Sequence, residues 1–394
     1  RKKLMKILLC FFFLLGTTMA KSINIVHFNI KELDSTKIKT LSPPLKEVKK
    51  ILKAHKPDLV FFNEIQYDSP GVPNAQYTTK GENLAKLNKL LDLNLNNSSF
   101  YPANTGKEAK KNSQGEYNVN PNAPGARELA DQVNFGTFPY QYSSGVITKF
   151  KIIKESVIST LKWKSFNPKI DLTKFTGADG SKLPNDMELF DKNFLDTLIE
   201  VDGKKIHIIT LHTVPAYHFG NKKSPNYLRN RDQLRFLEWY LTGKTDIDVN
   251  LNSITPIQGE SFIAAGDWNV GFKTDNPGAS VMQNILNKTN PWIKQSEMNF
   301  TNEGNGYGPK PFRLMLDYLV TSNDLKIKRG KIIHPNFERI ELGCGSQVKD
   351  KEKEAMVKVK YEDNGKTCYA LIHQEYIDFK TASDHYPIFA EVEI

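Results

Sequence analysis

The chain has 394 residues, of which 39% are hydrophobic, so it can bury a sizeable core and fits one large domain or two small ones. Its formal net charge of +10 favours polyanionic partners such as nucleic acids. A general richness in Lys, Asn and Ile raises the charge equally well without any binding role, and both interpretations stay open.

The first 20 residues predict a secretory signal peptide. Arg1, Lys2, Lys3 and Lys6 precede an apolar stretch over 7–15, and small residues up to Ala20 follow it. That stretch is too short to span a membrane. We therefore expect a secreted or periplasmic protein, cleaved after Ala20, whose remaining chain carries a charge of about +6.

Strands and helices alternate in the rest of the chain. Apolar runs of four to seven residues, rich in Ile, Val, Leu and Phe, predict buried strands, and apolar residues at a spacing of three and four predict helices. Strands are expected at 23–28, 59–63, 144–148, 152–161, 195–201, 205–211, 262–265, 316–320 and 388–392, and helices at about 44–55, 83–91 and 228–241. This mixture predicts two packed sheets flanked by helices.

Three polar segments, 94–134, 167–191 and 335–380, read as excursions over the surface. Since no Pro- or Ser-rich linker divides the chain, we expect a single domain over 21–394. The last excursion holds Cys344 and Cys368. In an exported protein such a pair favours a disulfide over a metal site, because zinc sites usually need four ligands at tighter spacing.

Polar side chains stand at the ends of the predicted strands. Such positions at a sheet edge are typical of site residues on a rigid scaffold. The residues are Asn29, Glu64, His212, Asp267, Asn269, Asp317, Asp384 and His385. Several carboxylates, two amides and two imidazoles in this arrangement make a metal-assisted hydrolytic centre the leading hypothesis.

Each of these residues also has a purely structural interpretation. Asp267 and Asn269 in Gly-Asp-Trp-Asn can address one water or phosphate, or simply form a turn after a strand. Glu64 follows an apolar run, where a carboxylate suits Mg²⁺ or Mn²⁺ or pairs with a surface lysine. His385 can act as an acid oriented by Asp317, or be structural, and the same holds for His212.

The ordered motifs FNIKEL, FFNEIQ, QYSSGVITK, LHTVP, GDWN, LDYLV and SDHYP carry a resemblance. From about residue 23 to 394 the chain resembles the endonuclease/exonuclease/phosphatase superfamily, the fold of deoxyribonuclease I and exonuclease III. Within it the chain looks closer to an exported bacterial branch. The resemblance implies a four-layer α/β sandwich, with two mixed sheets packed face to face and a divalent metal at their edge.

The resemblance also implies roles. Glu64 would bind the metal, Mg²⁺ or Mn²⁺ with Ca²⁺ also compatible, with Asn29 close by and Asp384 as a further acid of the metal site. Asp267 and Asn269 would handle the attacking water, and Asp317 would orient His385 at the scissile phosphate. Further phosphate contacts are expected from His212, Tyr142, Arg229, Asn230 and Arg235. Asn63 and Thr210 depart from the family pattern of Gln and Asn, which bears on substrate contacts.

The expected function is therefore that of an exported, metal-dependent phosphoesterase, acting first on DNA or RNA, as a monomer without a protein partner. The alternative is a phosphatase or phosphodiesterase on small phosphate esters, inositol phosphates or phospholipid head groups. A lipid-directed enzyme should expose an apolar hairpin, and the sequence shows no convincing one. A non-catalytic binding protein on the same fold is a third interpretation, disfavoured because Glu64, Asp267 and His385 are all present.

Overall fold

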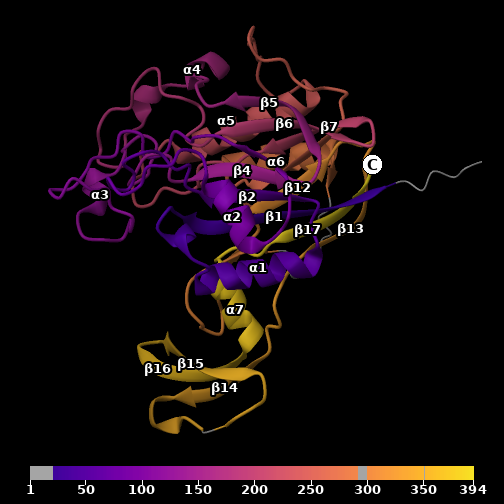
Figure 1. Ribbon diagram of the computed structural model, residues 1–394. Coiled ribbons are helices and arrows are strands. Elements are labelled where there is room, and N and C mark those ends of the chain that lie inside the picture. The colour runs from indigo at the N-terminus through magenta and orange to yellow at the C-terminus, as the bar shows by residue number, and fades with distance from the viewer. Residues whose placement is uncertain (1–20, 292–299, 350) are drawn as a thin grey trace, which may run out of the picture.

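Two six-stranded mixed sheets form the centre of the molecule (Figure 1). The computed structural model describes residues 21–291, 300–349 and 351–394, so the expected signal peptide lies outside the described residues. The first sheet has the order β13-β17-β1-β2-β4-β3, with β1 Ser22–Leu33, β2 Leu59–Ile65, β3 Asn97–Phe100, β4 Ser143–Thr148, β13 Lys326–Ile332 and β17 Ile388–Glu393. The second has the order β5-β6-β7-β8-β12-β9, with β5 Lys151–Ile158, β6 Phe194–Val201, β7 Lys204–Thr210, β8 Phe262–Asp267, β9 Asn290–Pro291 and β12 Asp317–Thr321.

The apolar runs of the first sheet face two different layers. Leu59 and Phe61 of β2 lie in the core between the two sheets, whereas Val60 and Phe62 lie in a second core on the outer face. Successive side chains of a strand point to opposite faces, so a strand buried on both sides needs an unbroken apolar run. This explains why these strands are apolar throughout rather than alternating.

Helices cover both outer faces. Residues of α1 (Pro43–His55), α2 (Asn83–Leu91) and α7 (Gln374–Ala382) share the outer core with the first sheet. Residues of α5 (Asn226–Thr242) and α6 (Pro277–Lys288) pack on the second sheet, and the short α3 (Ala126–Leu129) and α4 (Trp163–Phe166) lie in the connections. The four-layer sandwich with two mixed sheets face to face is therefore confirmed.

The polar segments are more ordered than the sequence predicts. The first contributes β3 as the edge strand of the first sheet. The second, over 167–191, buries Leu172, Met187 and Leu189 in the central core, so it is a covering layer rather than a solvated loop. The expectation of purely superficial excursions was wrong, because spaced apolar residues anchor each of them.

The third excursion forms a small antiparallel sheet that projects beyond α7 in Figure 1. Its order is β14-β16-β15, with β14 Arg339–Cys344, β15 Met356–Asp363 and β16 Lys366–His373. Cys344 and Cys368 are register partners on β14 and β16 and form a disulfide, as expected. The bridge thus links two neighbouring strands rather than closing an irregular loop.

Strand directions bring the predicted site residues to one edge of the sandwich. In the parallel pairs β1–β2 and β7–β8 the carboxyl ends meet, with Asn29 in register with Asn63. β12 runs antiparallel to β8 and starts with Asp317 opposite Asp267. The described residues include no helix that is long and apolar enough to cross a membrane.

Candidate active site

Asp267, at the end of β8, lies at the centre of the converging strand ends. Its Oδ2 atom is 3.1 Å from Nδ2 of Asn29, 3.5 Å from Nε2 of His212 and 3.8 Å from Nε2 of His385. The side chain of Asp267 is almost completely buried. Side chains of three other residues from separate parts of the chain therefore meet at a single carboxylate oxygen of Asp267.

Glu64 reaches this cluster through an irregularity of β2. Its Oε1 accepts a hydrogen bond from Nδ2 of Asn29 at 3.0 Å, and Oε2 accepts one from the backbone N–H of Glu32 at 2.9 Å. The register of β2 shifts between Phe62 and Ile65, and Glu64 has φ of 65°. Bulges beside active sites re-aim a side chain, and a carboxylate held in this strained conformation points to a functional constraint.

Asp317, at the start of β12, holds two histidines. Its Oδ2 lies 2.7 Å from Nδ1 of His385, and its Oδ1 lies 2.8 Å from Nε2 of His27. The backbone N–H of Asp317 donates to Oγ1 of Thr301 at 2.9 Å. All of these groups are buried, so the carboxylate fixes the imidazole of His385 with its Nε2 directed toward Asp267.

The protonation states follow from these contacts. Burial alone would raise the pKa of Asp317, but His385 and His27 outweigh burial and lower that pKa well below its usual range. Burial likewise opposes the charge of His385, yet Asp317 and Asp267 beside it raise its pKa well above the ordinary value. The pair is therefore an ionised aspartate with a protonated imidazole near neutral pH.

The other three groups of the cluster are less easily charged. Burial raises the pKa of Asp267, and the negative charge of Asp317 raises it further. Burial and the nearby Asp384 raise the pKa of Glu64. Burial lowers the pKa of His212 well below its ordinary value, with Lys192 acting in the same direction. His212 is thus a neutral imidazole, able to accept or donate one hydrogen bond or to bind a cation.

This donor set fits a divalent cation. Ligand atoms of Glu64, His212 and Asp267 all lie within 4.8 Å of one another, and so do those of Asp267, Asp317 and His385. The buried carboxyl groups of Asp267 and Asp317 and the partly buried Glu64 face one protonated histidine, and a cation would favour the ionised forms of Asp267 and Glu64. Carboxylate and amide oxygens are the donors that Mg²⁺, Mn²⁺ and Ca²⁺ prefer.

Asn269 supports the site through its backbone and its amide. Its N–H donates to Oδ1 of Asp267 at 2.9 Å, and its Nδ2 donates to the carbonyl oxygen of Thr213 at 3.1 Å. Asn269 has φ of 52°, a conformation that asparagine tolerates better than most residues. The Asp267–Asn269 turn is therefore an ordinary Asx-type turn after a strand and, at the same time, part of the cluster.

Tyr142 and Asp384 lie at the rim. The hydroxyl of Tyr142 donates to Oε1 of Glu32 at 3.1 Å, and burial together with Glu32 raises the pKa of this phenol. Asp384 is partly exposed and forms an ion pair with Nζ of Lys31 at 3.1 Å. Both residues interact electrostatically with Glu64, and their roles in metal and phosphate binding stay predictions. Each is held by a neighbour that sequence reasoning did not single out.

The expected phosphate contacts from α5 are not supported. Arg229 is buried and donates to the carbonyl oxygens of Leu189, Glu188 and Val133 and to Oδ1 of Asn134. Asn230 is also buried, and its Nδ2 donates to Thr213, Val214 and Trp268. These two side chains fasten the connections to α5 rather than bind a ligand.

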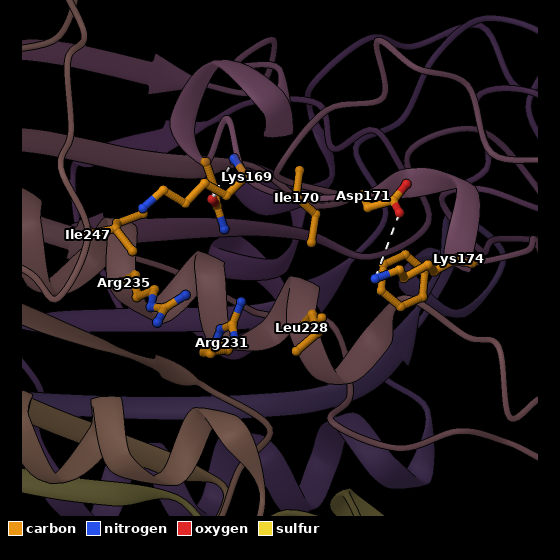
Figure 2. Close-up of a pocket in the computed structure, with 10 residues that line it drawn as sticks. Lys169, Ile170, Asp171, Lys174, Leu228, Arg231, Arg235 and Ile247 are labelled. Atoms are coloured by element: carbon orange, nitrogen blue, oxygen red, sulfur yellow. Dashed lines mark hydrogen bonds and ion pairs between the residues drawn. The ribbon is translucent and has the colours of Figure 1, made fainter.

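Arg235 lies elsewhere. Together with Arg231, Lys169 and Ile170 it lines a separate cavity of about 330 Å³ beside α5, shown in Figure 2. Its guanidinium donates to Asp232 at 2.9 Å and pairs with Asp246. None of the strand-end residues lines this cavity, so Arg235 is not part of the cluster around Asp267.

Two buried residues of the site were missed from the sequence. His27 lies two positions before Asn29 on β1 and therefore on the same face, a signal that was available. Asn63 accepts a hydrogen bond from the backbone N–H of Asp267 at 2.8 Å through Oδ1, and its Nδ2 donates to Oγ of Ser144. The departure at Asn63 is thus a structural contact that holds Asp267 in place.

Comparison with solved structures finds several similar chains. The chain is similar to an endonuclease/exonuclease/phosphatase from Beutenbergia cavernae DSM 12333, with 14% identity and a TM-score of 0.51, over 95% of this chain and 72% of that one. It is also similar to D. rerio TDP2 complexed with a single-strand DNA product (14%, TM-score 0.45, 95% and 99%) and to sphingomyelinase C from Streptomyces griseocarneus (15%, TM-score 0.46, 94% and 99%).

A search of curated proteins finds no match to the chain. The model of the endonuclease/exonuclease/phosphatase family, in contrast, matches residues 26–385, which include every strand-end residue of the cluster around Asp267. The chain therefore belongs to the endonuclease/exonuclease/phosphatase family, whose members are metal-dependent phosphoric ester hydrolases.

Proposed function

We propose that this protein is an exported phosphodiesterase that cleaves nucleic acid with the help of a divalent cation. The observation that carries the reaction is the cluster at Oδ2 of Asp267, where Asn29, His212 and His385 converge within 3.8 Å. The basic charge of +10 and the order of the nuclease-like motifs support a polyanionic substrate.

Asp267 is the group that orients and deprotonates the attacking water. Its Oδ1 accepts the N–H of Asn269 and its Oδ2 accepts the amide of Asn29, so the carboxylate is fixed in the cluster. A carboxylate whose pKa lies nearer to neutral than usual is a better proton acceptor, and the burial of Asp267 acts in that direction.

His385 and His212 stabilise the charge that develops on the phosphate. Protonated His385 presents Nε2 as a donor, and Asp317 preserves that proton and the ring orientation through Nδ1. His212 is neutral and contributes a hydrogen bond rather than a charge. Two imidazoles with different protonation states thus have different tasks at the same phosphate.

Glu64, Asn29 and Asp384 are the residues that we assign to the cation, with Asp267 within reach. A bound divalent cation would polarise a phosphate oxygen and offset the negative charge of the cluster. The hydrogen bonds from Asn29 and from the N–H of Glu32 hold the two carboxylate oxygens of Glu64 in fixed directions. The identity of the metal, Mg²⁺ being our first proposal, rests on the oxygen-rich donor set.

Export is part of the proposal and rests on the sequence of residues 1–20. The disulfide between Cys344 and Cys368 agrees with an oxidising compartment. Sequencing the amino terminus of protein recovered outside the cytoplasm tests it. A terminus at Lys21 is expected, and an uncleaved chain retained in the cytoplasm would contradict export.

The test of the substrate class is hydrolysis by residues 21–394 of matched substrates: supercoiled DNA, single-stranded RNA, inositol phosphates and sphingomyelin. We expect nicking of DNA or RNA with Mg²⁺ that is lost with a chelator and lost in Asp267→Asn. Activity confined to an inositol phosphate or to sphingomyelin would keep the hydrolytic cluster and overturn the nucleic-acid substrate.

A further inference from the structure

The exposed aromatic residues of the described chain lie on segments that are connected to the site. Only four large hydrophobic side chains are exposed in the part of the chain that the structure describes: Ile153, Tyr217, Phe219 and Phe312. Tyr217 and Phe219 follow His212 by five and seven residues, and Phe312 lies in the hairpin of β10 (Asn302–Glu303) and β11 (Arg313–Leu314). That hairpin contacts the site, because Asn302 forms a β-bridge with His385.

The segment that carries Tyr217 is fastened to the catalytic turn. The N–H of Thr213 donates to the carbonyl oxygen of Asp267, and the N–H of Ala216 donates to that of Asn269. The amide of Asn276 donates to the carbonyl oxygen of Ala216 at 3.0 Å. The backbone that precedes Tyr217 is therefore held by hydrogen bonds to the Asp267–Asn269 turn and to Asn276.

Tyr217 and Phe219 form a pair at the surface. Their ring centroids are 5.1 Å apart at an interplanar angle of 86°, and each side chain is 60% exposed. Phe219 has φ of 49°, which is sterically unfavourable for a bulky side chain because Cβ approaches a carbonyl oxygen. An exposed ring held in such a conformation gains little from burial, so its position requires another explanation.

The surroundings of the pair are cationic rather than aliphatic. Lys222 and Lys223 follow Phe219 and are exposed. Lys273 is exposed, and its Nζ lies 5.5 Å from the ring centroid of Phe272. It lies three residues before Asn276, whose amide donates to the carbonyl oxygen of Ala216. Exposed aromatic rings beside lysines match the way in which proteins bind single-stranded nucleic acid, by stacking bases and attracting the backbone. A lipid surface would be met by a broader apolar patch.

We propose that Tyr217 and Phe219 are a stacking platform for unpaired nucleobases adjacent to the scissile phosphate. This assignment rests on the proposed nuclease function and narrows its substrate to single-stranded nucleic acid, or to a duplex end that has opened. The bases would stack on the aromatic pair while the lysines contact the backbone. Phe312 lies in the hairpin that forms the β-bridge with His385 and is not part of this platform.

The test compares two single-stranded hexamers, one with bases and one with abasic sugars next to the cleavage point, with bis(p-nitrophenyl) phosphate as a third substrate that needs no platform. The variants are Tyr217→Ala and Phe219→Gly, with Ile153→Ala on the edge strand β5 as the matched control. Glycine accepts a positive φ, so Phe219→Gly relieves backbone strain while removing the ring.

We expect KM for the base-bearing hexamer to rise roughly tenfold in Tyr217→Ala and in Phe219→Gly, since stacking of a base on an aromatic ring is commonly of that size. KM for the abasic hexamer and the rate on bis(p-nitrophenyl) phosphate should stay as in the parent protein. The Tm of Phe219→Gly should hold or rise. This combination separates a binding platform from a structural role, which would lower Tm and affect all three substrates.

Equal KM for the base-bearing hexamer in all variants would overturn the platform and leave the nuclease intact. If the parent protein cleaves bis(p-nitrophenyl) phosphate but neither hexamer, the nuclease function itself fails, and the platform with it. Binding to sphingomyelin-phosphatidylcholine vesicles is measured in parallel. Loss of vesicle binding in both variants, with unchanged hexamer cleavage, would overturn base stacking in favour of a lipid interface.

Discussion

Asp317 determines the charge pattern of the site, because its carboxylate contacts both His27 and His385. Its negative charge raises the pKa of His385 and also raises that of Asp267. One residue therefore keeps the imidazole protonated and makes its neighbouring carboxylate a better base. Two neighbouring carboxyl groups whose pKa values shift in opposite directions, lowered for Asp317 and raised for Asp267, are typical of hydrolytic sites.

The Asp317→Asn substitution should lower activity by on the order of a hundredfold or more, because His385 loses the charge that preserves its proton. The direction of the expected shift in the pH-rate profile follows from the raised pKa of His385. The protonated, active form exists below that pKa, so a lower pKa moves the alkaline decline of the pH-rate profile to lower pH. Profiles of kcat/KM for the parent and the variant measure this shift, and superimposable profiles would exclude the role of Asp317.

Arg229, in contrast, has a structural role, because it holds chain connections to α5. Arg229→Met should lower the free energy of unfolding by about 3 kcal/mol, because several buried carbonyl oxygens lose their donor. In protein that remains folded, KM should be unchanged. Arg235→Ala is the companion variant on the same helix and should leave KM unchanged as well. A raised KM with an unchanged Tm in Arg229→Met would instead support the expected contact of Arg229 with phosphate.

Residue types at strand ends could be predicted from the sequence, whereas their partners could not. Asp267, His385 and Glu64 were singled out because polar groups at either end of an apolar run are conspicuous. Arg229 was misjudged because its hydrogen-bond partners lie about 40 and 95 residues away in chain connections. The contact of Asn63 with Asp267 spans 204 positions, and no local pattern predicts such a contact.

At the scale of elements, the close contact between β7 and β8 keeps the site together. A Cβ atom added at Gly266 would lie 1.7 Å from the carbonyl oxygen of Leu211. His212 follows Leu211 and Asp267 follows Gly266, so this contact sets the separation of two site residues. The glycine of the Gly-Asp-Trp-Asn motif is therefore required by packing between strand ends and not by a turn alone.

We expect Gly266→Ala to lower the free energy of unfolding by about 2–3 kcal/mol through overpacking and to reduce kcat strongly, since His212 and Asp267 must move apart. Gly308→Ala is the matched control, because a Cβ there meets nothing within 4 Å and the position needs no positive φ. Denaturation midpoints and kcat of both variants decide the matter. A fully active Gly266→Ala protein would show that the contact is not needed.

Strands with unbroken apolar runs were predicted to within a few residues, because burial on both faces leaves a clear signal. The projecting sheet was missed. In β15 apolar and polar residues alternate, and the lysines made the segment resemble solvated loop. Its turn at Asn364-Gly365 carries the same hairpin signal as Asp202-Gly203, and both residues have positive φ. The helix α6 was also not predicted, although Asn276 as N-cap and Pro277 in the first turn are typical signals of a helix start.

At the scale of the whole molecule, the order of the strands is set by contacts between distant parts of the chain. β1 lies between β17 and β2, and Ser22 pairs with Glu393 at the other end of the chain. The number and type of strands could be predicted locally, but which strands are neighbours depends on packing between the layers. The resemblance implied two mixed sheets packed face to face, but the order of their strands was not predicted.

Stability should depend on pH through His207, which joins β7 to β6 and to the connection before β8. Its Nδ1 lies 2.9 Å from both oxygens of Asp196, and its Nε2 lies 3.1 Å from Oε2 of Glu260. Burial opposes the charge, but the two acids outweigh burial and raise the pKa of His207 above its ordinary value. The protonated form therefore stabilises the fold fully below the unfolded pKa near 6.5, and this contribution is lost as pH rises through the folded pKa.

The His207→Gln protein should consequently be less stable than the parent at pH 5.5, with a difference that shrinks toward pH 9. Urea denaturation at a series of pH values measures the difference. His55→Gln is a suitable control, since burial lowers the pKa of that histidine and the dependence should have the opposite sign. A difference for His207→Gln that stays constant with pH would contradict the ion-pair account.

The central claim is that the cluster around Asp267 binds a divalent cation and hydrolyses a phosphodiester. The most direct measurement is the rate of bis(p-nitrophenyl) phosphate hydrolysis by residues 21–394 with Mg²⁺, with Mn²⁺ and with a chelator, beside Asp267→Asn, Glu64→Gln and Arg235→Ala. The account predicts hydrolysis that the chelator abolishes, that Asp267→Asn and Glu64→Gln lose, and that Arg235→Ala retains. Hydrolysis that persists in the chelator, or that survives in Asp267→Asn, would contradict it.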